Sequence, residues 1–264
     1  MLTAGIDLSV GATMVFASIV MGRLGVLAGI PLILVIPFSL LVAAAMGYIN
    51  GALVAHIKLP PFIATLGTWN MYYALTLWYS QNATIGGPDI MEKAPALLWL
   101  GTPVNFLGVH LTIGSFAMVL MFVFVWYVLN RTAYGRHIYA VGDDLEAARL
   151  AGIRVNHVLV SVYVISGLIC GASAWALIGR VGSVTAHAGY TSNLDSITAV
   201  VVGGTSLFGG RGAIFGTLIG ALIVGVFRNG LALAGADVLW QDFAIGLLIV
   251  VAVIIDQWIR KTVA

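Results

Sequence analysis

Charged residues are scarce in this sequence: Asp, Glu, Lys and Arg make up 8% of its 264 residues, whereas 61% are hydrophobic. A soluble domain carries about a quarter charged residues, so the polar surface of a soluble protein of this size cannot be built. The hydrophobic residues gather in runs of helical length, not in the alternating segments of about ten residues that are typical of outer-membrane barrels. The composition therefore predicts an all-α, polytopic transmembrane protein.

Other shortages exclude further classes. The single cysteine, Cys170, rules out an intrachain disulfide, and its apolar neighbours in the sequence indicate a small core residue. The basic residues are dispersed and the net charge is +2, so no nucleic-acid partner is implied. The N-terminus has no basic region and is interrupted by Asp7, which argues against a cleavable signal peptide. The five histidines lack metal-binding spacing, and no grouping of nucleophile and base is present, so we predict neither a metal site nor enzymatic activity.

About eight apolar segments can be recognised, and we treat residues 1–264 as one transmembrane domain. The first and sixth are short for a full crossing, which needs about 20 residues, so they are expected to be kinked, broken or partly re-entrant. Pro31 and Pro37 should bend the second segment. The segments cover residues 8–22, 26–47, 59–79, 111–129, 157–179, 195–209, 212–233 and 239–258.

The distribution of basic residues predicts the orientation. If both termini lie in the cytoplasm, eight of the 12 Lys and Arg residues fall on that side, in agreement with the positive-inside rule. The loop 130–156 is then cytoplasmic, and the loops 80–110 and 180–194 face outward.

The cytoplasmic loop contains the one long charge-dense stretch of the chain, residues 135–155. Asp143 can cap the first turn of a short helix, Glu146 stands at capping-box spacing, and Gly152 can supply a left-handed end. A helix of about eight residues does not persist alone in water, because nucleation is costly and few hydrogen bonds repay it. The helix must therefore dock on something.

Two other polar features have alternative readings. Trp69, Asn70 and Tyr73 fall around the middle of the third segment and suit the mixed apolar and hydroxyl surface of a sugar, although membrane aromatics more often serve packing. The glycine-rich stretch 204–211 has no Lys-Ser/Thr after it, so it is no Walker A loop and is better explained as a tight turn between the sixth and seventh segments.

Four blocks of sequence, in order along the chain, resemble the permease subunits of ABC importers for monosaccharides of the ribose, xylose, arabinose and fructose group. They are GIDLSVG at 5–11, PFIATLGT at 61–68, the loop motif at 134–153 and VGGTSLFGGRGAIFGTLIGALI at 202–223. By this resemblance, structural motif positions are Gly5, Asp7, Ser9, Gly11, Gly203, Gly204, Gly209 and Gly210.

The resemblance implies a set of partners in a bacterial inner membrane: a second permease copy, surrounding lipid, a periplasmic sugar-binding protein and a separate ATPase that carries ATP and Mg²⁺. The short helix at 144–151 would be the coupling helix seated in a cleft of that ATPase, with Leu145, Ala148 and Leu150 as its apolar contacts. The residues assigned to coupling are Asp143, Asp144, Leu145, Glu146, Ala147, Ala148, Arg149, Leu150 and Gly152.

The chain departs from the family pattern at two places. Family members usually carry two more membrane segments before GIDLSVG, so these are expected to be missing, and Tyr73-Ala74 stands where the family often has Arg-Gly. Two other functions stay open: an ion-coupled secondary transporter and a permease for branched-chain amino acids. The GIDLSVG block favours the sugar branch, and the residues at 256–261 are most similar to those of fructose permeases.

Overall fold

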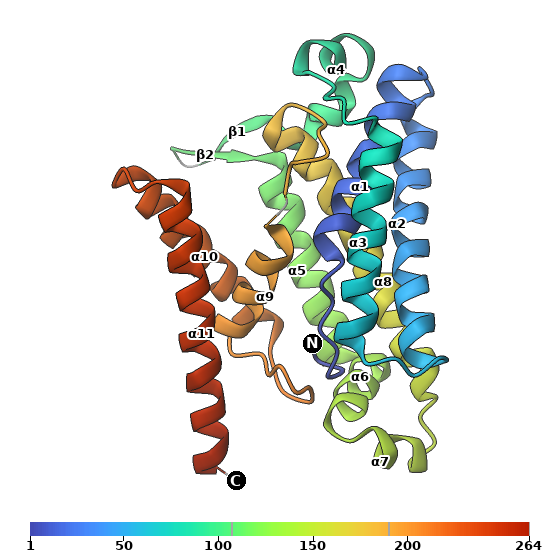
Figure 1. The fold of residues 1–264 in the computed structure, drawn as a ribbon, viewed down its shortest axis with the longest axis vertical. Helices are drawn as coiled ribbons and strands as arrows, with labels where there is room; N and C mark the ends of the chain where they lie inside the picture. The colour runs from blue at the N-terminus through green and yellow to red at the C-terminus, as the bar shows by residue number, and fades with distance from the viewer. Residues whose placement is uncertain (107, 190, 264) are drawn as a thin grey trace. The chain divides into compact units, whose positions relative to one another are not determined.

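Helices dominate the computed structural model, which describes residues 1–106, 108–189 and 191–263 (Figure 1). Each of the predicted apolar segments overlaps one helix: α1 (Val10–Gly22), α2 (Leu32–Ala55), α3 (Pro61–Ser80), α5 (Ile113–Arg131), α8 (Val155–Val181), α9 (Ser192–Val202), α10 (Ile214–Leu233) and α11 (Val238–Val263). Among the described residues, 5 helices are long and apolar enough to cross a membrane: α1 with its extension to Leu27, α2, α5, α8 and α10. The prediction of an all-α polytopic membrane protein is confirmed.

The first two segments meet at a different point from the one predicted. A π-helix, η1 (Arg23–Leu27), continues α1, and Gly29 then takes a φ of +66°. Pro31 immediately precedes α2, where its missing N–H costs no helical hydrogen bond, and Pro37 lies inside that helix. The predicted start of the second segment at residue 26 is therefore wrong. The sixth segment is short as predicted, because the 11 residues of α9 span only roughly 16 Å.

Shorter elements occupy the two long loops. The loop 80–110, predicted to face outward, contains α4 (Gly87–Lys93), the 3-10 helix η2 (Pro95–Gly101) and part of an antiparallel hairpin of β1 (Pro103–Phe106) and β2 (Val109–Thr112). The loop 130–156, predicted to be cytoplasmic, contains α6 (Ala133–Asp143) and α7 (Leu145–Leu150). The sequence did not predict the hairpin or α6.

The chain divides into two compact units. One comprises Met1–Ile6, Phe122–Val155 and Thr191–Ala264, and the other comprises Asp7–Met121 and Asn156–Tyr190. The first therefore joins α6 and α7 with α9, α10 and α11. The second holds α1 to α4, the outer hairpin and most of α8. That residues 1–264 act as a single domain stays a prediction.

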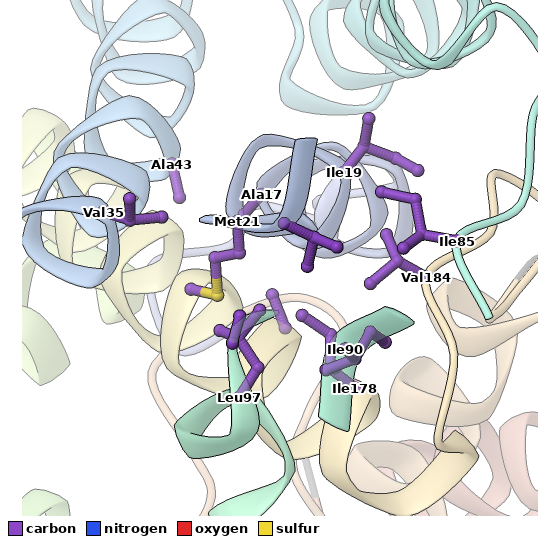
Figure 2. Packing of buried hydrophobic residues seen from close by; sticks show 13 residues of the cluster. Ala17, Ile19, Met21, Val35, Ala43, Ile85, Ile90, Leu97, Ile178 and Val184 are labelled. Atoms are coloured by element: carbon purple, nitrogen blue, oxygen red, sulfur yellow. The ribbon is translucent and has the colours of Figure 1, made fainter. Parts of the chain in front are cut away.

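The larger unit, 7–121 with 156–190, has an apolar core built from side chains that are distant in sequence. Met21 points toward Leu97, and Ile85 lies beside Val184, with which it exchanges two backbone hydrogen bonds of 2.9 and 3.0 Å (Figure 2). Between α2 and α8 the contact is closer still, because a Cβ on Gly47 would overlap the carbonyl group of Tyr163. Small residues allow this backbone approach, which is the usual way for membrane helices to pack.

Candidate functional site

The loop 130–156 folds as two short helices, and both have a side-chain N-cap. The Thr132 hydroxyl accepts a hydrogen bond from the Gly135 N–H at 3.2 Å and so begins α6. Asp144 Oδ1 accepts from the N–H groups of Glu146 and Ala147, both at 2.9 Å, and so begins α7. The prediction that Asp143 caps the short helix is wrong. Asp143 is instead the last residue of α6. The prediction failed because α6 itself was not recognised from the sequence.

The end of α7 follows the prediction. Gly152 takes a φ of +84°, its N–H donates to the Arg149 carbonyl at 3.0 Å, and the Ile153 N–H donates to the Ala148 carbonyl at 3.1 Å. This pair of bonds is a Schellman motif, which needs a left-handed residue that glycine adopts without steric cost. With caps at both ends, α7 is a defined helix of six residues.

The side chains of α7 divide into an exposed and a buried set. Leu150 is 89% exposed and Leu145 is 40% exposed, so both can contact a partner. Ala148 is only 4% exposed, and the expectation that it faces the partner is corrected: it fastens α7 to the chain itself. Glu146 was predicted at capping-box spacing. Its carboxylate instead forms an exposed ion pair with Arg149 at 3.2 Å. The remaining coupling residues, Asp143, Asp144 and Ala147, are exposed.

The helix α6 packs against the glycine-rich turn between α9 and α10. The Tyr139 hydroxyl donates to the Gly212 carbonyl at 2.9 Å. Burial raises the pKa of the Tyr139 phenol, so the hydroxyl keeps its proton and remains a donor at neutral pH. At the end of α6, a Cβ on Gly142 would overlap the Leu2 carbonyl oxygen, so the N-terminal peptide also lies against this helix.

The glycine-rich turn is closed by its own hydrogen bonds, as the sequence predicted. The Ser206 N–H donates to the Arg211 carbonyl at 2.9 Å, and the Ser206 hydroxyl accepts from the Phe208 N–H at 3.0 Å. Gly204, Gly209 and Gly210 take left-handed φ values of +79°, +87° and +69°, which explains the choice of glycine there. Gly203, at the end of α9, has a negative φ and is required for a different reason, the close approach of α10.

The first two motif blocks meet at the entry to α1. Asp7 Oδ1 accepts hydrogen bonds from the Ser9 N–H at 2.8 Å and the Ser9 hydroxyl at 2.7 Å, and the Ser9 hydroxyl accepts from Asn50 Nδ2 at 2.7 Å. The Leu8 N–H donates to the hydroxyl of Thr65, which belongs to the second block. Burial raises the pKa of the Asp7 carboxyl, and the bonds from Ser9 oppose that shift. Gly5 and Gly11 are buried on either side of this turn.

All three side chains proposed for a substrate path lie on α3. Asn70 is exposed, and its Nδ2 donates to the Leu66 carbonyl of its own helix at 3.1 Å. Trp69 packs against an apolar cluster that includes Met46 and Tyr72, and Tyr73 is half-buried. Their role in a substrate path stays a prediction. Within the described residues, no three His, Cys, Asp or Glu side chains lie close enough together to hold a metal ion.

An ion triad joins α9, α10 and α11, and the sequence analysis did not predict it. Arg228 Nη2 of α10 donates to Asp195 Oδ1 of α9 and to Asp242 Oδ1 of α11, each at 3.1 Å. The signal in the sequence was the presence of charged residues on three consecutive apolar segments: Asp195, Arg228, and Asp242 with Asp256. Because charges in apolar segments usually pair, this pattern could have predicted the contact.

The sequence of this chain is similar to known permeases. The family model described as "Branched-chain amino acid transport system / permease component" matches residues 1–253. A fructose import permease protein of Rhizobium meliloti is 56% identical over 263 residues, which are 100% of this chain and 73% of the relative. A ribose import permease protein of Bacillus subtilis is 39% identical over 259 residues, 97% of this chain and 77% of the relative. No solved structure matches.

Proposed function

The chain belongs to the branched-chain amino acid transport system / permease component family, as a permease subunit of a sugar ABC importer, and we propose that its own substrate is fructose. It is a multi-pass membrane protein and a transporter subunit, so a separate ATPase and a binding protein complete the system. Support for fructose is the 56% identity to a fructose permease, against 39% to a ribose permease. The bacterial inner membrane is the location we propose for this subunit.

The capped helix α7 carries the proposal for how the subunit works. It is exposed, it has a defined beginning and end, and it presents Leu145 and Leu150 to an apolar cleft of a partner. ATP, with Mg²⁺, binds in the partner ATPase, and closure of that ATPase moves α7. The movement biases the permease between its outward-facing and inward-facing states, which requires only that the ATPase bind the two states differently.

A second permease copy and lipid would cover the apolar helix faces that the chain leaves open. Val226 and Leu233 of α10 are 71% and 82% exposed, and Leu120 of α5 is 72% exposed. Faces as apolar as these suit either a helix of a second copy or lipid tails. We assign the homodimer from the family, and the mass of the purified permease in detergent would test it.

Transport by the reconstituted system tests the proposed function. The permease, its ATPase and its binding protein are placed in liposomes, and uptake of labelled fructose, ribose and leucine is compared with and without ATP. We expect uptake of fructose that needs both ATP and the binding protein. ATP-dependent uptake of ribose or leucine in place of fructose would overturn the substrate assignment, and uptake without the ATPase would overturn the coupling mechanism.

Leu150 allows a direct test of the coupling role. Leu150→Asp places a charge on a side chain that is 89% exposed, so folding should be unaffected while an apolar contact with the ATPase is lost. We expect the ATPase to stop co-purifying with this variant. Leu233→Asp is not a suitable control, because α10 is a membrane helix. The matched control is Met91→Asp, which places a charge on a 62% exposed apolar side chain of α4, outside the residues assigned to coupling, and should retain the ATPase.

A further inference from the structure

The helix α7 follows α6 after one extended residue and is held close to it. One residue, Asp144, separates the two helices, and its N–H still donates to the Ala140 carbonyl of α6 at 3.2 Å. Ala148 is buried, which fastens α7 to the chain from the other side. A displacement of α7 by a partner would therefore carry α6 with it.

The end of α6 has no free space on the side of the glycine-rich turn. A Cβ on Gly210 would lie 2.9 Å from the Asp143 Cα and 3.1 Å from the Asp143 Cβ. A Cβ on Gly209 would lie 2.7 Å from the Ala4 backbone N, in the N-terminal peptide. The Gly210 N–H donates to the Leu2 carbonyl at 2.9 Å. Three segments that are far apart in sequence thus meet backbone against backbone.

The turn leads directly into two helices that are packed in the same way. A Cβ on Gly203 would overlap the Gly216 carbonyl group, and a Cβ on Gly220 would overlap the Ala199 carbonyl oxygen. The α9 and α10 helices are therefore joined by backbone contacts along about one helical turn, next to the loop that α6 touches. Farther along α10, Arg228 ties both helices to α11 through Asp195 and Asp242.

We infer that α6, the turn 203–212 and the N-terminal peptide form one rigid connection, through which movement of the coupling helix reaches α9 and α10, and that Tyr139 is its positioning residue. The inference rests on the proposed coupling function of α7. Side chains can change rotamer and absorb a displacement, whereas backbone groups in contact cannot, because packed interiors are nearly incompressible. All the segments concerned belong to the same compact unit of the chain.

Tyr139 makes a side-chain hydrogen bond between α6 and the turn, because its hydroxyl donates to the Gly212 carbonyl at 2.9 Å. Without it, α6 would keep its steric contacts with Gly209 and Gly210 but could slide along the turn. Loss of the bond should therefore lower the efficiency of transmission and leave assembly with the ATPase intact. A residue with a merely structural role would instead reduce the amount of folded protein.

The first test is Tyr139→Phe in the reconstituted transporter, with sugar imported per ATP hydrolysed as the readout. We expect the ATPase to co-purify normally and the ratio to fall about fivefold, the factor that corresponds to one hydrogen bond. The control is Tyr127→Phe, since Tyr127 is 56% exposed on α5 and lies in the same compact unit. An unchanged ratio would overturn the inference, as would loss of ATPase binding, which would show a structural role.

The second test asks whether α6 and the turn move together. Asp143→Cys and Gly210→Cys are combined in a Cys170→Ala background, because the 3.1 Å separation of the Cβ positions is close to the 3.5–4.5 Å of a disulfide. For a rigid connection we expect transport to survive oxidation. Transport that is lost on oxidation and restored by a reductant would show that the two parts separate during the cycle. Each single variant, treated in the same way, controls for the strain of Cys at the left-handed Gly210 position.

These outcomes are distinguishable from failure of the proposed function. If Leu150→Asp retains the ATPase and transports normally, α7 is not the coupling helix and the proposed function fails. If Leu150→Asp fails while Tyr139→Phe keeps the wild-type ratio of sugar to ATP, the coupling helix is confirmed and only its transmission through Tyr139 is refuted.

Discussion

Asp144 stabilises α7, the proposed coupling helix, at its first turn. Its Oδ1 satisfies two N–H groups at the start of α7, both at 2.9 Å, and a helix of six residues has few other sources of stability. The neighbouring carboxylate of Asp143 makes no cap, so the two adjacent acids have different functions despite their identical chemistry. One begins α7, and the other ends α6 where it touches Gly210.

Substitution of Asp144 measures that contribution. Asp144→Ala removes both cap bonds and should cost about 1 kcal/mol of helix stability. Because the ATPase must then order the helix on binding, its affinity for the permease should fall about fivefold. Asp144→Asn is the matched control, since Asn caps as well as Asp does and removes only the charge. Equal affinities for Ala and wild type, measured by titration of the ATPase in detergent, would show that the cap does not limit binding.

The contact between α9 and α10 depends on a glycine, which has only a hydrogen atom in place of a side chain. Gly220 has no room for a Cβ, because it would overlap the Ala199 carbonyl oxygen, whereas Gly225, on the same helix, has no atom within 4 Å of its Cβ position. Gly220→Ala should therefore destabilise the protein by about 1–3 kcal/mol, as overpacking does. Gly225→Ala should be neutral or slightly stabilising.

Thermal unfolding of the purified permease, compared for the two glycine variants, checks this expectation. Both substitutions add one methyl group to α10, so any general effect on the helix is shared. A Gly220→Ala variant that unfolds at the same temperature as Gly225→Ala would mean that α9 and α10 do not approach as described. It would also weaken the transmission inference, which needs the same contact.

The membrane helices could be predicted because each corresponds to one continuous run of apolar residues in the sequence. The α7 helix could be predicted for the same reason, since its cap residues and Gly152 are neighbours in sequence. The α6 helix escaped notice because Gly135 and Gly142 lower its helix propensity. Its stability comes from packing: Gly135 lies against the backbone of Leu129, and Gly142 against that of Leu2.

Contacts between distant segments left no comparable signal. The bond from Tyr139 to Gly212 joins residues 73 positions apart, and nothing in either local sequence identifies the other. Two glycine-rich motifs were therefore recognised, but the reason for their glycines, mutual backbone contact, was not. The same holds for Asn50, which binds Ser9 of the first motif from 41 residues away.

Chain connectivity supports the predicted side of the membrane for α7, the proposed coupling helix. Only α5 intervenes between the outer elements α4 to β2 and the α6–α7 loop, so these two regions face opposite sides if α5 spans the membrane. Positive charge follows the same division, because the loop after α5 carries Arg131, Arg136, Arg149 and Arg154. The loop is therefore predicted to be cytoplasmic, where an ATPase can reach it.

Labelling with a membrane-impermeant maleimide tests this orientation. In a Cys170→Ala background, Leu150→Cys should react in inside-out vesicles and Met91→Cys in right-side-out cells, because these side chains are 89% and 62% exposed. The Cys170→Ala chain, which contains no cysteine, gives the background of the reaction. Labelling of both positions from one side would contradict a crossing by α5. Added ATPase should then protect Leu150→Cys and leave Met91→Cys reactive, which ties the orientation of the permease to the surface that its partner covers.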